Sequence, residues 1–257
     1  MSLEDEFSDV IAKAMKGMEI EAEDLAEQSG VSPCEISGLL HGDMDESVVR
    51  KISEILGLDA DSIIALPSYM PAPLTLPGIR RIELPFRQWS VNAWAVEIDG
   101  TQILFDTGFG ERDVVEAVSC EGLDAVLITH DHPDHVGGVA ALDSMRLCIV
   151  SEVEAMKSGV LEIGGVEIRV VDLSGHKSPA VGYVFDHSGI PVLVAGDAIF
   201  AGSMGGCSSQ SAYELAFDTL REAFAGMPDD CVILPGHGPA TTLAEEMKSN
   251  PFRSAFR

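Results

Sequence analysis

Apolar and polar residues follow two different periods along this chain, and the change of period divides it into two regions. In four early segments, apolar residues recur every three or four positions, which is the spacing of amphipathic helices. These helices are expected over residues 7–18, 21–28, 33–40 and 46–56. Later segments are short apolar or alternating runs, which is the pattern of β-strands. The pattern therefore predicts a helical N-terminal region followed by a region built on strands.

A stretch that is rich in proline and nearly uncharged lies between the two regions, as expected of a semi-rigid linker. We assign residues 1–66 to a small all-α domain, residues 67–79 to the linker and residues 80–257 to a second domain. In the first domain, Ser32 and Glu35 form a capping box around Pro33, which marks the start of a helix.

The segment over residues 24–42 resembles the helix-turn-helix of phage repressors. Its charge is wrong for DNA, because residues 1–66 hold 4 basic and 16 acidic residues and DNA affinity comes mainly from Lys and Arg on phosphates. The expected recognition helix, residues 33–40, has no Lys, Arg, Asn or Gln to contact base edges. We therefore expect a dimerisation or partner-docking module, with a homo-oligomer formed through this domain, rather than nucleic-acid binding.

The most informative motif follows an apolar, partly β-branched run over residues 125–128, which predicts a buried strand. The next residues include His130, His132, Asp134 and His135. Imidazole and carboxylate groups are ligands for Zn²⁺, Fe²⁺ and Mn²⁺. The chain has only 7 histidines, so three of them in one turn indicate a metal site rather than a solvated polar turn.

Three further ligand-type side chains follow later predicted strands. His176 follows the strand over residues 166–171, Asp197 follows residues 191–196, and His237 follows residues 231–236. A single aspartate after a strand is more often a helix cap. Four strand ends that each carry ligand-type residues instead predict one metal site at one edge of a sheet.

These residues, in this order, resemble the ligand pattern of the metallo-β-lactamase superfamily, over residues 80–257. The resemblance implies an α+β fold, the αββα sandwich, in which two sheets pack face to face between helices. Residues 196–200, 235–239 and 242–252 are similar to the glyoxalase II (hydroxyacylglutathione hydrolase) branch and its small bacterial relatives.

The resemblance also implies a dinuclear, metal-dependent hydrolase that acts on a thioester or related acyl substrate. One metal would be bound by His130, His132 and His176, the other by Asp134, His135 and His237, and Asp197 would bridge them. A hydroxide between the two ions would be the nucleophile, with Asp134 and Asp197 as the catalytic carboxylates. Zn²⁺ is the expected ion, and Fe or Mn suits the same ligands. Asp106 precedes Thr107 and Gly108, so it either orients a ligating imidazole or only forms a turn.

The chain departs from glyoxalase II where that branch holds glutathione. The loop over residues 201–209 has no Lys, Arg or Tyr, so an anionic tripeptide would find no cation there. Lys177, Lys248 and Arg253 are the alternative cations. We therefore expect weak turnover of S-lactoylglutathione and better turnover of a smaller or less anionic acyl compound.

Two other functions stay open. One is a mononuclear iron enzyme like the persulfide dioxygenases of the same superfamily. The other is a regulatory protein in which the helical domain binds DNA or a partner and the metal domain senses a ligand.

The composition indicates where in the cell the protein is expected to act and on what kind of partner. The formal net charge is −26, which disfavours nucleic acid and anionic membranes. No apolar run reaches the length of a membrane span, and the acidic start is unlike a signal peptide. The 5 cysteines show no paired spacing, as expected of reduced thiols. We therefore expect a cytoplasmic protein that acts on small molecules.

Overall fold

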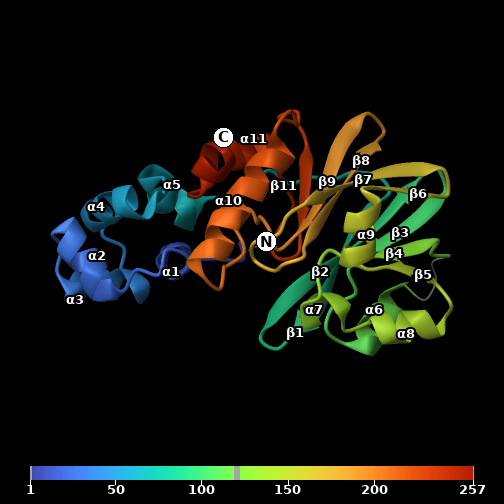
Figure 1. The fold of residues 1–257 in the computed structure, drawn as a ribbon, viewed down its shortest axis with the longest axis horizontal. Helices are drawn as coiled ribbons and strands as arrows, with labels where there is room; N and C mark the ends of the chain where they lie inside the picture. The colour runs from blue at the N-terminus through green and yellow to red at the C-terminus, as the bar shows by residue number, and fades with distance from the viewer. Residues whose placement is uncertain (1, 119–121, 257) are drawn as a thin grey trace.

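Two β-sheets form the centre of the larger region in the computed structural model, which describes residues 2–118 and 122–256 (Figure 1). The first sheet has the order β1-β2-β3-β4-β5. Its strands are β1 (Ile79–Phe86), β2 (Trp89–Ile98), β3 (Thr101–Phe105), β4 (Ala125–Leu127) and β5 (Cys148–Val150). The first three are antiparallel neighbours, and β3, β4 and β5 are parallel.

The second sheet has the order β11-β10-β9-β8-β7-β6. Its strands are β6 (Val160–Ile163), β7 (Val166–Asp172), β8 (Val181–His187), β9 (Ile190–Gly196), β10 (Val232–Pro235) and β11 (Thr241–Thr242). The pair β9 and β10 is parallel, so their carboxyl ends meet at the same edge. Asp197 and His237 follow these two strands and therefore lie at that edge.

The central strands of the sheets, such as β3 and β9, are buried on both faces because apolar residues occupy both sides of the pleat. In β3, Ile103 and Phe105 pack between the sheets, while Leu104 packs outward against helices. In β9, Val194 packs between the sheets and Leu193 packs outward. The outer helices are α6 (Glu111–Val118), α7 (Pro133–Val136), α8 (Val139–Ser144), α9 (Glu152–Ser158), α10 (Gln210–Phe224) and α11 (Leu243–Ser249). The predicted αββα sandwich is confirmed.

The N-terminal region is helical, as its apolar spacing predicts. Its helices are α1 (Phe7–Gly17), α2 (Ala22–Ser29), α3 (Pro33–Leu40), α4 (Glu46–Leu56) and α5 (Ala60–Ala65), followed by a 3₁₀ turn over Leu66–Ser68. The capping box is present, since Ser32 accepts from Glu35 N and the Glu35 carboxylate accepts from Ser32 N. Helix α5 was not predicted. Of the described residues, none belongs to a helix long and apolar enough to cross a membrane.

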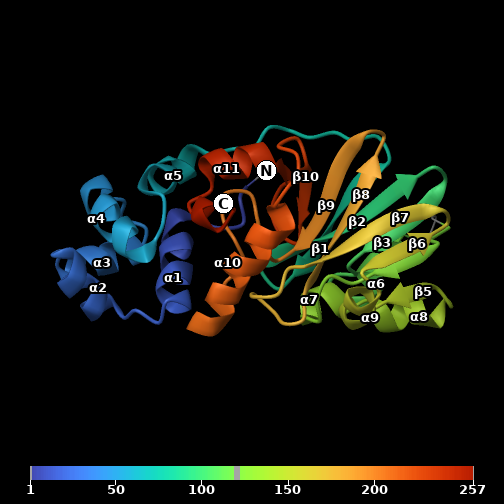
Figure 2. The same cartoon turned by 45° about the horizontal axis from the view of Figure 1, so that its top comes forward.

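The N-terminal helices pack directly on the second sheet's helical layer. Figures 1 and 2 both show α1 beside α10 and α5 beside α11. One continuous apolar cluster joins Ile11 of α1 to Leu220 of α10 and to Leu193 of β9. The contact is close at Gly17, where a Cβ atom would lie 2.5 Å from the Tyr213 ring.

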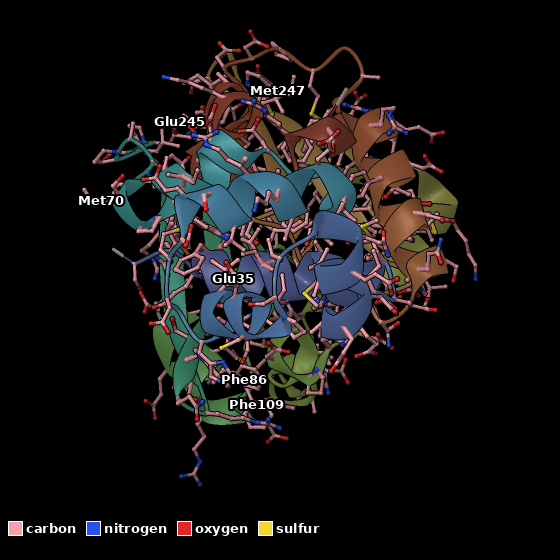
Figure 3. The ribbon with its side chains drawn as sticks, turned by 90° about the vertical axis from the view of Figure 1, so that its left-hand side faces the viewer. Glu35, Met70, Phe86, Phe109, Glu245 and Met247 are labelled. Carbon is pink, nitrogen blue, oxygen red and sulfur yellow. The ribbon has the colours of Figure 1, made fainter. Side chains whose placement is uncertain are left out.

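From the helical side, α3 is in front and carries Glu35 on its near face (Figure 3). Phe86 and Phe109 lie together at the lower edge of that view, with ring centroids 5.4 Å apart.

Candidate metal centre

The structure brings the seven predicted ligand residues together in two adjoining groups. Each group offers ligand atoms that lie within 4.8 Å of one another. The first group is His130, His132, His176 and Asp197, and the second is Asp134, His135 and His237. The grouping follows the ligand sets that the resemblance implies, with Asp197 placed in the first group.

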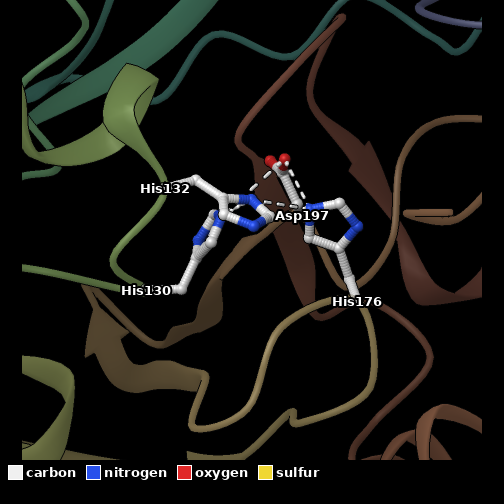
Figure 4. Close-up of side chains that lie close together, drawn as sticks. All are labelled: His130, His132, His176 and Asp197. Atoms are coloured by element: carbon white, nitrogen blue, oxygen red, sulfur yellow. Dashed lines mark hydrogen bonds and ion pairs between the residues drawn. The ribbon is translucent and has the colours of Figure 1, made fainter. Parts of the chain in front are cut away.

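The first group converges on one point (Figure 4). Nδ1 of His132 lies 3.1 Å from Nε2 of His130 and 3.0 Å from Nε2 of His176. Oδ2 of Asp197 lies 3.8 Å from Nε2 of His130 and 3.5 Å from Nε2 of His176. Ligands about 2.0–2.1 Å from a tetrahedral zinc are roughly 3.3 Å apart. The spacing of these four atoms therefore suits a single ion.

The second group adjoins the first at Asp197. Nε2 of His237 lies 3.4 Å from Oδ2 of Asp134 and 3.5 Å from Oδ2 of Asp197. Nε2 of His135 lies 3.2 Å from Oδ1 of Asp197. Asp197 thus contacts histidines of both groups.

Two buried atoms in this centre, Nε2 of His135 and Oδ1 of Asp197, face each other at 3.2 Å and form no other hydrogen bond among the described residues. A buried polar atom left unsatisfied costs about 1–3 kcal/mol. A divalent cation between them would accept electron pairs from both atoms. The chemistry of the donors and these two atoms therefore fit a metal centre.

In three of these histidines, the nitrogen that faces away from the centre, Nδ1, forms a hydrogen bond with an oxygen atom. Nδ1 of His135 donates to Asp106 at 2.8 Å, Nδ1 of His176 donates to Gly206 O at 2.7 Å, and Nδ1 of His237 donates to Ser90 O at 2.8 Å. With the proton on Nδ1, the lone pair of each Nε2 faces the centre.

Asp106 also forms hydrogen bonds with a residue other than His135. Its carboxylate also accepts from the backbone N and the hydroxyl of Thr129, both at 2.8 Å. Its φ of 60° lies in the left-handed region, which Asp tolerates better than most residues. Thr107, the next residue, donates its hydroxyl to His135 O at 2.9 Å. The Asp-Thr-Gly element thus makes a turn and also holds the imidazole and the backbone of His135.

Burial and nearby carboxylates shift the pKa values of the buried histidines in opposite directions. Burial lowers the pKa of His135, but Asp197 and Asp106 outweigh it and raise that pKa to about 10. For His237, the same opposition of burial and Asp197 raises the pKa to about 11. Burial raises the pKa of Asp197, but His135 and His237 bring it well below its ordinary value. In the metal-free chain, protons occupy positions that a cation would take.

Gly205 and Gly236 have no side chain and so leave room for the predicted ligand residues to lie close together. A Cβ atom on Gly236 would overlap Oδ1 of Asp197 and would lie 2.7 Å from Cε1 of His135. A Cβ atom on Gly205 would overlap the backbone oxygen of Asp197 and crowd the ring of His176. Larger residues at these positions would displace the ligands.

The N-terminal region contributes side chains that the sequence did not predict for this site. Oε2 of Glu4 lies 3.8 Å from Nδ1 of His237. Burial raises the pKa of Glu4, and His237 partly opposes this. Lys13 of α1 pairs with Asp5 and donates to Met204 O at 2.9 Å. Its Nζ lies 5.0 Å from the centroid of the Phe200 ring.

The three predicted substrate cations lie in different places. Lys177 is beside the ligand His176 and pairs with Asp131 at 2.9 Å. Lys248 is in α11, and its backbone oxygen accepts from Arg253 at 3.0 Å. The other guanidinium nitrogen of Arg253 pairs with Asp59, just before α5. Of the three, Lys177 is the one that adjoins a ligand residue.

Comparison with known proteins agrees with this geometry. Residues 87–146, which include the histidine cluster, match the Metallo-beta-lactamase superfamily. The solved structure of the BLEG-1 B3 metallo-beta-lactamase is similar, with a TM-score of 0.56 and 23% identity, over 68% of this chain and 99% of that chain. The chain has the metallo-β-lactamase fold.

Two further relatives bear on its chemistry. A hydroxyacylglutathione hydrolase of Rhodopseudomonas palustris is 32% identical over 139 residues, which cover 48% of this chain and 52% of that protein. The chain thus matches about half the length of that relative. The metallo-β-lactamase fold is shared with TTHA1623, solved in a di-iron-bound form, at 25% identity and a TM-score of 0.52, over 72% of this chain and all (100%) of that chain. These matches agree with the metallo-β-lactamase fold of this chain.

Proposed function

We propose that this chain is a dinuclear metal-dependent hydrolase of thioesters or related acyl compounds. One observation carries the proposal: two ligand groups meet at Asp197, whose buried Oδ1 faces Nε2 of His135 and forms no other hydrogen bond among the described residues. The hydroxyacylglutathione hydrolase relative supports the thioester class, and the di-iron structure supports a pair of ions. Zn²⁺ is the expected ion, and Fe or Mn suits the same donors.

When bound, two divalent cations would supply a water of lowered pKa, about 7 instead of ~15.7, and would polarise the substrate carbonyl. The chain's own residues keep the donors in place. Asp106, Ser90 O and Gly206 O hold the outer nitrogens, so the ring of each ligand histidine keeps its direction.

Asp134 is the carboxylate that we assign to proton uptake from the attacking water. Asp197 faces four histidines within 3.8 Å, which leaves it occupied as a ligand. Asp134 faces one histidine, His237, at 3.4 Å. This contact uses Oδ2, so we assign Oδ1 to take the proton and return it to the leaving group.

The helical domain, residues 1–66, is proposed as a part of this enzyme. It packs on α10 through a continuous apolar cluster, and it brings Glu4 and Lys13 to the metal centre. Its acidic charge disfavours DNA binding. One of its acidic residues, Glu35, lies on the near face of α3 in Figure 3. The helix-turn-helix resemblance and the homo-oligomer stay predictions.

The proposal is tested by metal analysis coupled to a panel of acyl-thioesters that includes S-lactoylglutathione. We expect hydrolysis of at least one thioester, loss of activity after chelation and its recovery when zinc, iron or manganese is restored. Protein that holds two ions per chain but hydrolyses no thioester or ester would refute the proposal.

A further inference from the structure

The segment over residues 69–77, here called the strap, lies along one flank of the sandwich without adding a strand to either sheet. On this flank the edge strands are β1 in the first sheet and β11, which has only two residues, in the second. Pro71, Pro73 and Pro77 have no N–H group to pair with an edge strand. Figure 2 shows the segment after α5 running along the sheets before the chain enters β1. The strap therefore covers the flank without closing it by backbone pairing.

Hydrogen bonds hold the strap at both ends. At its start, the hydroxyl of Tyr69 donates to Oε1 of Glu246 at 3.0 Å. At its end, the backbone oxygen of Pro77 accepts from Nε2 of His187 at 2.6 Å. Between these anchors, Leu74 packs against the apolar cluster that lies between the sheets. The strap thus forms a wall whose two ends are fixed.

A cavity of about 550 Å³ lies between the strap and the sheets. Most of its lining side chains are apolar and come from the strap, β1, β2 and β10, namely Leu74, Leu76, Ile79, Trp94, Val232 and Leu234. Nε1 of Trp94 donates to Pro235 O at 2.9 Å, so the polar atom of this ring is already satisfied. Pockets that hold small molecules have volumes of about 300–1,000 Å³ and mostly apolar linings. The cavity has the size and lining of such a site.

The charge on the lining is balanced by the chain itself. Among the described residues that line the cavity, Arg81 carries the only formal charge. Its Nη2 lies 3.3 Å from Oε2 of Glu83, and its Nε donates to Oδ1 of Asn92 at 2.6 Å. Met70, which also lines the cavity, is 75% exposed and stands at the edge of the molecule in Figure 3. The lining therefore offers apolar contacts and calls for no counter-ion.

We infer that this cavity binds a neutral, apolar small molecule such as an aryl or alkyl alcohol. The site is additional to the proposed hydrolase centre, because none of the seven ligand residues lines it. A small molecule suits it better than a protein partner, since a specific protein interface buries about 800 Å² on each side. A charged ligand would lose hydration without gaining an unmatched partner.

The test uses the Trp89→Phe form of the full chain, in which Trp94 is the remaining tryptophan. Two probes of the same shape are titrated, 4-(4-bromophenyl)butan-1-ol and 4-(4-bromophenyl)butanoate, which differ in charge. Bromine quenches tryptophan fluorescence on contact, so the emission of Trp94 reports occupancy of the cavity and gives a Kd for each probe. No metal and no turnover are needed, so the result does not depend on the hydrolase proposal.

We expect saturable quenching by the alcohol and binding of the butanoate that is weaker by at least about tenfold. Ala240→Phe places a ring in the cavity and should weaken the alcohol by about tenfold or more, as the loss of roughly two buried methylene contacts would. Ala244→Phe makes the same substitution at an exposed position of α11 and should leave the Kd unchanged.

Three results would overturn the inference. The first is quenching of Trp94 that rises linearly with the alcohol and does not saturate, and this result requires no variant of Ala240. The second is butanoate binding as tight as that of the alcohol, which would refute the neutral class. The third is a folded Ala240→Phe chain, checked by circular dichroism, with the same Kd as the Ala244→Phe chain.

Discussion

Asp106 accepts a hydrogen bond from Nδ1 of His135 at 2.8 Å, and this bond fixes the direction in which His135 can bind a metal. His135 is fully buried, so bulk water does not compete with the carboxylate for its Nδ1. The opposite nitrogen, Nε2, is left facing Asp197 at 3.2 Å. A residue 29 positions away in sequence thus prepares one ligand of the second group.

Replacing Asp106 by Asn should weaken metal binding at the second group. Oδ2 accepts from His135 Nδ1 and Thr129 Oγ1, and Oδ1 accepts from Thr129 N. In Asn one of these two positions becomes an NH₂ donor, so it would face at least one N–H donor that has lost its acceptor. Loss of such a supporting bond lowers metal affinity by about 10–100-fold. Competition with a chromophoric chelator measures the affinity, and Asp143→Asn, at an exposed site, is the control. Affinity equal to wild type would contradict the role of Asp106.

Metal binding should release protons and should strengthen as the pH rises. The pKa of His135 is raised to about 10 and that of His237 to about 11, so both imidazoles hold protons at pH 8 in the metal-free chain. Each must lose its proton before its Nε2 can bind a cation. Zinc titration calorimetry in two buffers of different ionisation enthalpy measures the release. Identical heats in the two buffers would show that the sites are already deprotonated.

Glu246 supports the loop behind the metal centre and should be essential for stability. Its buried carboxylate accepts from Gly202 N at 2.9 Å, Asn250 Nδ2 at 2.8 Å, Thr241 Oγ1 at 2.7 Å and Tyr69 OH at 3.0 Å. Glu246→Gln replaces one accepting oxygen with a donor, which leaves buried donors unsatisfied. We expect a loss of about 1–3 kcal/mol in the free energy of unfolding.

Denaturant unfolding of the Glu246 variant measures that loss. The neighbouring Glu245→Gln is the control, because Glu245 is only partly buried. If the Glu246 variant unfolds at the same denaturant concentration as wild type, the hydrogen-bond network does not stabilise the fold.

Much of the fold and site follows from local signals in the sequence. Helices α3 and α4 have the predicted bounds, because a capping box or capping aspartate starts each and apolar spacing defines the buried face. The ligand residues were found because they follow short apolar strands, and parallel strands such as β9 and β10 end at the same edge. Because the chain has only 7 histidines, the grouping of three of them in one turn was easy to recognise.

The contributions of the N-terminal region could not be predicted in this way. Glu4 and Lys13 reach the metal centre because α1 packs against α10, and no local pattern encodes that contact. Helix α5, Ala60–Ala65, is too short to show a clear period. Arg253 looked available for substrate, but it pairs with Asp59 across the two regions. The spacing of residues along the chain does not show which charged side chains will pair when they are far apart in sequence.

The number of divalent ions per chain tests the central claim most directly. Wild-type protein loaded with zinc and freed of excess metal should contain two ions per chain by elemental analysis. Asp197→Ala should lose metal and hydrolytic activity while it stays folded, because Asp197 contacts both ligand groups. A wild-type content of one ion or none, or full activity in Asp197→Ala, would contradict the dinuclear account.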